Sequence, residues 1–119
     1  MSNEWTVEFF SAFEMEFDTF TEAVQDAILI KAKLLEKEGP QLGRPHADTL
    51  VGSRHANMKE LRCYADDGAW RIAFAFDPKR KAILLTAGDK AGIKEKRFYR
   101  QLISKADERF DRHLKEQKG

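Results

Sequence analysis

The side chains best suited to chemistry in this sequence are a carboxylate, a phenol and three cations, namely Glu60, Arg62, Arg71, Lys90 and Tyr99. A carboxylate can accept a proton, a phenol can stack on a base or transfer a proton, and cations stabilise developing negative charge. Gathered on one folded surface, they would bind a polyanion and stabilise a phosphorane-like transition state. We take them as the candidate catalytic set.

Each of these residues also has a purely structural interpretation, which the sequence alone leaves open. Glu60 and Arg62 would form a cross-strand ion pair. Arg71 would be an exposed strand cation beside Trp70, and Tyr99 would pack under a C-terminal helix.

Charge is unevenly divided along the chain, although the net charge is only +1. Residues 1–50 hold 4 Lys and Arg against 10 Asp and Glu, whereas residues 51–119 hold 17 against 10. This asymmetry predicts a basic patch for an anionic partner, with an ordinary solvated surface as the alternative. The candidate binding cations are Lys59, Lys79, Arg80, Lys94, Lys96, Arg97 and Arg100.

The elements that must position these residues begin with three strands between Met58 and Lys90. Apolar residues at 70, 72, 74 and 76 alternate with Arg71 and small residues, so Arg71 lies on the face opposite the aromatic side chains. Asp66-Asp67-Gly68 and Asp77-Pro78-Lys79-Arg80 are turn sequences. The apolar run 82–87 is typical of an inner strand that is covered on both faces.

The residues before these three strands, which we expect to form a β-meander, predict a strand and a long helix. Alternation over 4–10 indicates a half-buried strand, which the apolar residues at 13, 15 and 17 would extend past an irregularity. Thr19 and Glu22 have capping-box spacing, and Gly39-Pro40 ends the helix. Two apolar stripes follow this helix, one at 23, 27, 30 and 34 and the other at 24, 28 and 35.

The remaining segments complete an α+β fold. Residues 41–57 are irregular, with Leu50-Val51 as the expected anchor. Apolar residues at 98, 102, 106, 110 and 114 predict a C-terminal helix whose other faces carry cations, Arg109 among them. We therefore expect one domain over 1–119, an antiparallel β-meander packed by an N-terminal helix or helices and by a C-terminal helix, in the order β-α-(α)-β-β-β-α.

The sequence lacks the residues that several functional classes need. No apolar run is long enough to span a membrane, and the N-terminus does not resemble a signal peptide. Cys63 is the single cysteine and reads as a core residue, and the three histidines lack metal-ligand spacing. We therefore expect a cytoplasmic protein with no metal site, no cofactor and no membrane partner.

Three segments together resemble a known family. GSRHANMKELR, WRIAFAFDPKRKAILLTAGDK and KRFYRQLISKADERFDRHL look like the RelE/ParE superfamily of type II toxins, closest to its phage-derived Gp49-like, HigB-type branch. The resemblance implies a translation inhibitor that cleaves mRNA on the ribosome without a metal. It also implies a cognate antitoxin, expected to be a helix-turn-helix protein encoded by the adjacent gene.

The resemblance also assigns roles within the candidate set. The ribose 2′-hydroxyl would attack the adjacent phosphate, with Glu60 at the position of a general base and Arg71 at that of the arginine contacting the scissile phosphate. Arg62 matches the basic residue closing its strand, Lys90 the basic turn, and Tyr99 a late aromatic residue. The turn after the last strand has no histidine, which leaves the general acid open.

Two alternatives to the endoribonuclease remain. The ParE branch of the superfamily shares the fold but inhibits DNA gyrase by binding it, and the fold cannot choose between these activities. A regulatory relative that binds only an antitoxin and operator DNA is the third hypothesis.

Overall fold

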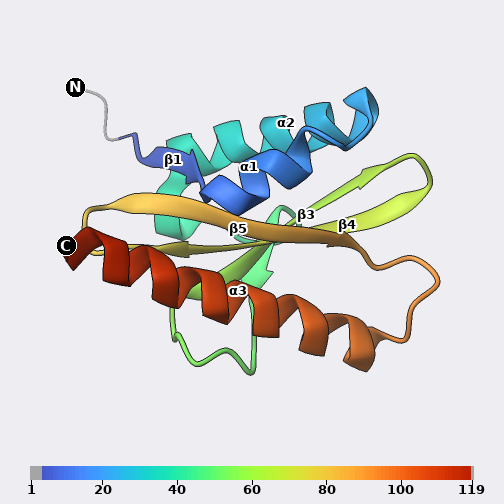
Figure 1. Ribbon diagram of the computed structural model, residues 1–119. Helices are drawn as coiled ribbons and strands as arrows, with labels where there is room; N and C mark the ends of the chain where they lie inside the picture. Colours follow the sequence, from blue (N-terminus) through green and yellow to red (C-terminus); the bar gives the residue numbers. More distant parts are fainter. Residues whose placement is uncertain (1–3, 119) are drawn as a thin grey trace.

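The structure is a computed structural model that describes residues 4–118. Its elements follow the chain in the order shown in Figure 1. They are β1 (Thr6–Phe9), α1 (Ser11–Phe17), α2 (Glu22–Glu38), a 3₁₀ turn η1 (Gly39–Gln41), β2 (Ala47–Thr49), β3 (Met58–Ala65), β4 (Gly68–Phe76), β5 (Lys81–Asp89) and α3 (Glu95–Lys118). None of the helices described is long and apolar enough to cross a membrane.

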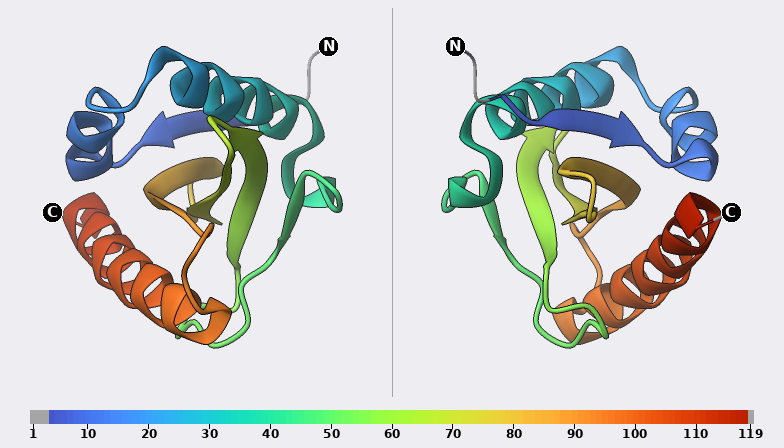
Figure 2. Two further views of the ribbon diagram at one scale, coloured as in Figure 1. Left: turned by 90° about the vertical axis from the view of Figure 1, so that its right-hand side faces the viewer. Right: turned by 90° about the vertical axis from the view of Figure 1, so that its left-hand side faces the viewer.

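The strands form a single five-stranded sheet in the order β1-β5-β4-β3-β2. β1 runs parallel to β5, and the other neighbours are antiparallel. Helices α1 and α2 cover one face of the sheet and α3 covers the other (Figures 1 and 2). This arrangement confirms the expected α+β class, the β-meander and the C-terminal helix.

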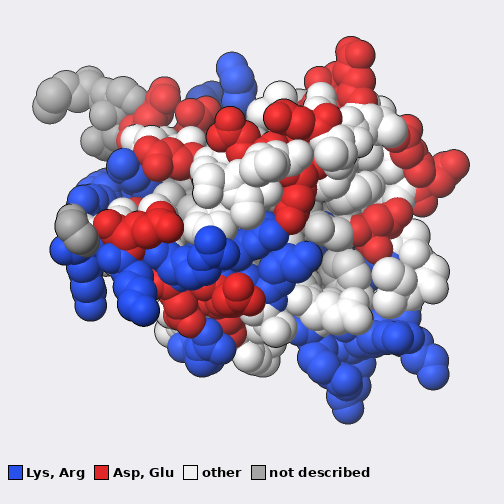
Figure 3. Space-filling model, viewed as in Figure 1, with Lys and Arg blue, Asp and Glu red and all other residues white. Residues whose placement is uncertain are grey.

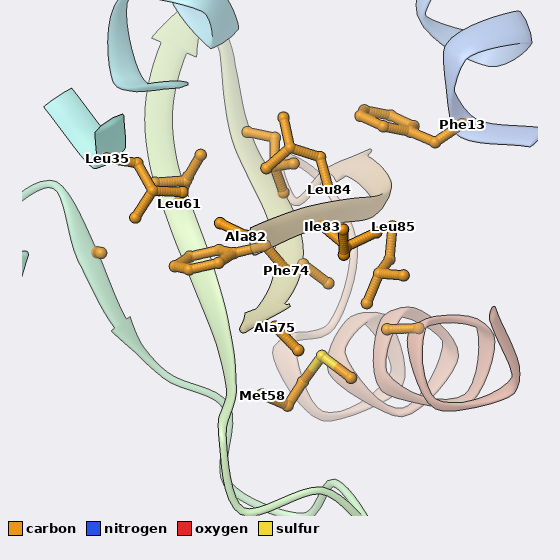
Figure 4. Close-up of a cluster of buried hydrophobic side chains, with 14 of the residues drawn as sticks. Phe13, Leu35, Met58, Leu61, Phe74, Ala75, Ala82, Ile83, Leu84 and Leu85 are labelled. Carbon is orange, nitrogen blue, oxygen red and sulfur yellow. The ribbon is translucent and has the colours of Figure 1, made fainter. Parts of the chain in front are cut away.

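The hydrophobic core lies on both faces of the meander (Figure 4). Leu61 meets Leu35 of α2 on one face, whereas Met58 and Ala75 lie toward α3 on the other. The apolar run of β5 is buried from Ala82 to Thr86. The expectation of an inner strand covered on both faces is therefore confirmed.

A β-bulge in β5 explains a buried arginine on α3. Ala73 pairs with Thr86 but Phe74 pairs with Leu84, so Leu85 is the extra residue of β5. Its carbonyl accepts a hydrogen bond of 2.8 Å from Arg109, whose guanidinium also binds both carboxylate oxygens of Glu16 at 2.9 and 2.5 Å. Arg109 therefore joins α3 to β5 and α1, and it is buried although it lies outside the predicted apolar stripe.

The N-terminal third differs from the expected pattern. Residues 11–17 form α1 rather than an extension of β1, because Phe13 and Phe17 are also spaced by four and both ring-pack with Phe9. The N-cap of α2 is Thr21, whose hydroxyl accepts from the amide of Val24, whereas the Thr19 hydroxyl bonds back to the carbonyl of Glu16. The expected capping box was therefore wrong, although the stop at Gly39 is confirmed.

One of the two apolar stripes of α2 faces solvent. The buried residues of this helix are Val24, Ile28, Ala32 and Leu35. Ile30, on the other stripe, is 61% exposed. The irregular segment contains the short edge strand β2, which the sequence did not predict. Of the two residues expected to anchor this segment, Leu50 is buried, whereas Val51 is 88% exposed.

Arg109→Met should lower the free energy of unfolding by about 2 kcal/mol, because it removes charge-assisted hydrogen bonds to Glu16 and leaves the Leu85 carbonyl unpaired. This loss is discounted for solvent screening, because the Glu16 side chain is 39% exposed. Urea denaturation followed by circular dichroism measures it, with the exposed Lys115→Met as control.

The difference should also depend on pH. The hydrogen bond from Arg109 lowers the pKa of Glu16, so the stabilisation is present at neutral pH and is lost as the pH falls through that lowered pKa. Equal stability of the Arg109 and Lys115 variants at neutral pH would contradict this role.

Candidate active site

The candidate site forms on the face of the sheet that α3 covers. A two-residue turn, Asp66 and Asp67, joins β3 to β4, and both residues have the positive φ of 50° and 59° that such a hairpin requires. The resulting register places Arg62 directly opposite Arg71. Two like charges facing each other across strands are destabilising, so this pair needs a compensating partner.

Tyr99 of α3 supplies part of that compensation. Its hydroxyl donates to Glu60 Oε1 at 2.9 Å and accepts from Arg71 Nε at 3.3 Å. Arg71 Nε lies 3.9 Å from the same Glu60 oxygen, and Arg71 Nη1 donates to the carbonyl of Trp70 at 3.1 Å. The phenol therefore bridges a carboxylate of β3 and a guanidinium of β4.

Burial dominates the electrostatics of this cluster. Arg71 is 1% exposed and Glu60 is 5% exposed, so the interpretation of Arg71 as an exposed cation was wrong. Burial raises the pKa of Glu60, although the Tyr99 hydrogen bond and the Arg71 charge act in the opposite direction. Burial likewise raises the pKa of Tyr99. A carboxyl group with a raised pKa is suited to proton transfer near neutral pH.

A cleft of about 390 Å³ gives access to this cluster from one side. Glu60, Arg62 and Tyr99 are in its wall, whereas Arg71 lies behind them. The full lining is Arg44, Asp48, Thr49, Leu50, Val51, Glu60, Arg62, Glu95, Lys96 and Tyr99. A larger hollow of about 620 Å³ lies against the outer side of α3 and contains none of the candidate catalytic residues.

Arg62, which lines this cleft, has a buried donor that is unused. Within residues 4–118 its buried Nε has no hydrogen-bond partner. The expected ion pair between Glu60 and Arg62 does not form, since the cation near Glu60 is Arg71. A buried guanidinium nitrogen without an acceptor is costly in the free protein, and a bound anion would satisfy it.

The other wall of the cleft was missed by the sequence analysis. It comes from β2 and the residues beside it, where Arg44 and Asp48 form an ion pair of 2.7 Å. A strand of three residues is too short for alternation to reveal. Only its pairing with β3 shows that Asp48 lies opposite Glu60.

Lys90 lies near the cluster but outside the cleft. Its Nζ is 6.0 Å from the centre of the Tyr99 ring and 3.1 Å from Glu95. Four of the candidate cations, Lys94, Lys96, Arg97 and Arg100, are exposed at the start of α3. In Figure 3 blue side chains gather at the lower right, where α3 begins in Figure 1.

The remaining three candidate cations lie apart from this region. Lys79 and Arg80 are in the turn between β4 and β5, where Arg80 packs over Trp5 with its guanidinium carbon 4.4 Å from the ring centre. Lys59 donates to the carbonyl of Pro40 at 3.1 Å. The structure thus divides the predicted binding set between two regions.

The three histidines are each held in a structural contact away from the candidate site. His46 pairs with Lys31, His55 with Asp111 and His113 with Asp77. Cys63 is buried and its pKa is raised by burial, as suits a core thiol rather than a nucleophile.

The comparisons with known proteins agree with this fold. Residues 15–111 match the family model described as phage derived protein Gp49-like (DUF891). The match covers most of the chain, and the chain therefore belongs to the Gp49-like family, which confirms the resemblance seen in the sequence.

Two relatives come from Mycobacterium tuberculosis. The protein described as toxin HigB2 is 49% identical over 90 residues, 75% of this chain, but the match spans only 44% of that relative. The protein described as toxin HigB3 is 51% identical over 86 residues, 72% of this chain and 73% of the relative. A mutant of the Escherichia coli toxin RelE in the free state shares the fold, with a TM-score of 0.57 at 15% identity over 89% of this chain and 97% of RelE.

Tyr99→Phe should raise the pKa of Glu60 further, because the lost hydrogen bond is one that favours the ionised carboxylate. Titration of the Glu60 side-chain carbon by NMR measures this shift. Tyr64→Phe is the matched control, since the Tyr64 ring lies against the other side of the cluster, with its centre 5.6 Å from the guanidinium carbon of Arg71. An unchanged or lower Glu60 pKa in the Tyr99 variant would mean that the bridge does not exist in solution.

Proposed function

We propose that this protein is the toxin of a type II toxin-antitoxin pair and acts as a ribosome-dependent endoribonuclease on mRNA. Its family, its relatives and its fold support a toxin of this type. The observation that carries the nuclease proposal is the cleft, which joins a carboxylate of raised pKa, a phenol and an arginine with a free donor. A basic helix start lies beside it.

The cleavage step needs a base, a charge acceptor and an acid. Glu60 takes the proton of the ribose 2′-hydroxyl, and the resulting oxygen attacks the adjacent phosphorus. The bond to the 5′-oxygen of the next nucleotide then breaks, leaving a 2′,3′-cyclic phosphate. Tyr99, which keeps its proton because burial raises its pKa, is the proposed proton donor to the departing 5′-oxygen.

Arg62 and Arg71 divide the work that the resemblance gave to Arg71 alone. Arg62 lines the cleft with an unpaired Nε, so we assign it the phosphate contact and the developing charge. Arg71 is 1% exposed and bonded to Tyr99 and Trp70, so it acts as a positioning residue that holds Tyr99 against Glu60. Lys90 contributes positive potential beside the Tyr99 ring.

The start of α3 is suited to the flanking phosphates of the RNA. Lys94, Lys96 and Arg97 lie at the positive end of the helix dipole, where cations are unfavourable for the free protein. A phosphate backbone would relieve this repulsion and release counterions. We assign RNA binding to these residues and Arg100, and give Lys59, Lys79 and Arg80 no direct part in it.

The proposal also includes an antitoxin partner and a cytoplasmic location. An antitoxin, expected to be a helix-turn-helix protein from the adjacent gene, would neutralise the protein in the cytoplasm. The gyrase alternative is not favoured, because the relatives are described as HigB toxins. A supercoiling assay with the purified protein distinguishes the two activities.

Expression of the native chain should arrest growth and produce cuts within codons, detected by primer extension on cellular mRNA. Glu60→Gln and Arg62→Ala should each reduce cleavage by at least about 100-fold, since they remove the base and the charge acceptor. Lys79→Ala, a cation of the distant turn, should cleave normally. Growth arrest with intact messages would overturn the nuclease proposal.

The pH profile of cleavage on purified ribosomes should show an acidic limb that belongs to Glu60. The base must be ionised, and burial raises its pKa, so the rate should rise with pH beyond the range of an ordinary glutamate. Arg71→Lys, which loses the hydrogen bond to Tyr99 but keeps a charge, should move this limb. A limb at ordinary glutamate pKa in both proteins would exclude Glu60 as the base.

A further inference from the structure

An apolar stripe on α2, Ala23, Ala27, Ile30 and Leu34, lies at the edge of the packed side of the helix and is covered only in part. Ala23 and Ile30 are exposed and Ala27 and Leu34 are half-buried. Their spacing of four, three and four residues is that of a helix–helix seam rather than of a solvated surface. The fully buried residues of the same helix are Val24, Ile28, Ala32 and Leu35, and Ala27 and Leu34 also touch the core.

On one side of this stripe the charges are sorted by position, whereas Glu38 flanks its other side. Glu22 and Asp26 lie in the N-terminal half, and Lys33 and Lys37 lie in the C-terminal half. All four are exposed, and none takes part in an ion pair found within residues 4–118. Figure 3 shows acidic side chains at the upper right, where α2 begins in Figure 1.

This sorting suits the dipole of one helix, but it also creates repulsion. Each acidic pair and each basic pair is spaced by four residues, which places like charges side by side on the helix surface. The helix dipole also gives no reason for Ile30 to be 61% exposed in the middle of the stripe. A second surface with the opposite order of charges would explain both features.

We propose that α2 pairs with α2 of a second copy of this chain, antiparallel, to form a two-fold symmetric dimer. If the two-fold axis crosses α2 between residues 28 and 29, Ile30 is level with Ala27 of the second copy. Leu34 is then level with Ala23 of that copy. Large residues then meet small ones along the whole seam. The two helix dipoles also run in opposite directions, which is favourable.

The same register makes the charges complementary. Asp26 lies two residues, or about 3 Å along the axis, from the level of Lys33 in the second copy, and Glu22 has the same offset from Lys37. Symmetry repeats both contacts, so four attractive pairs replace the repulsion within each helix. Because one helix per chain contributes, the interface is at the small end of the size classes and the dimer is weak.

Sedimentation equilibrium of the full chain tests the dimer, with Glu60→Gln present throughout so that the protein can be produced. From about 10 µM to about 1 mM, the apparent mass should rise from monomer toward dimer, as expected of a small interface. Ile30→Lys should keep the protein monomeric. Glu108→Lys, an exposed charge reversal on α3, should dimerise normally.

A charge exchange makes the test specific for antiparallel self-pairing. Asp26→Lys alone and Lys33→Asp alone should each be monomeric, because each opposes like charges across the axis. Mixed in equal amounts, they should form a heterodimer, since lysines of one copy then face aspartates of the other. Failure of the native chain to associate at the highest concentration would overturn the proposal, as would failure of the mixture. Binding of a protein from the adjacent gene to this face of a monomer would overturn it as well.

Discussion

The geometry of the candidate site depends on one hydroxyl group, that of Tyr99, which joins a carboxylate of β3 to a guanidinium of β4. The hairpin register brings two arginines face to face, and burial removes the water that would screen Arg71. Tyr99 can bridge the carboxylate and the guanidinium because it donates one hydrogen bond and accepts another. The position of α3 is therefore as important to the site as the strands themselves.

Three buried polar contacts hold α3 in that position. Arg109 ties it to β5 and α1. Asp107 accepts hydrogen bonds from the Ser53 hydroxyl and the Arg54 amide, and so fixes the loop that leads into β3. Asp77, in the turn after β4, binds His113 and Gln117 near the end of the helix. A long helix with such ties can hold a phenol against a carboxylate without help from a ligand.

The sequence predicted the meander well because its signals are local. Period-two alternation placed Arg71 opposite the aromatic face, and Asp66-Asp67-Gly68 marked the turn between β3 and β4. Period four likewise predicted the buried side of α3. The alternation accounts for Glu60, Arg62 and Arg71 on one face of the sheet, whereas the contact of Tyr99 with them appears only in the structure.

What the sequence could not predict depends on contacts between distant segments. The burial of Arg71 and Arg109 depends on partners 28 and 93 residues away. The three-residue strand β2 has no pattern of its own, yet it forms a wall of the cleft. Phe13 and Phe17 fit a strand period and a helix period equally, and packing on Phe9 decided between them.

The central claim is that Glu60 activates a ribose hydroxyl in the cleft, and replacing that hydroxyl tests it most directly. Single-turnover cleavage can be measured on purified ribosomes with a message that carries one 2′-deoxynucleotide at the cut position. The account predicts a 2′,3′-cyclic phosphate product from the all-ribose message and no cut at the deoxy position. Cleavage of the deoxy message at the same position would contradict it, and so would an uncut all-ribose message.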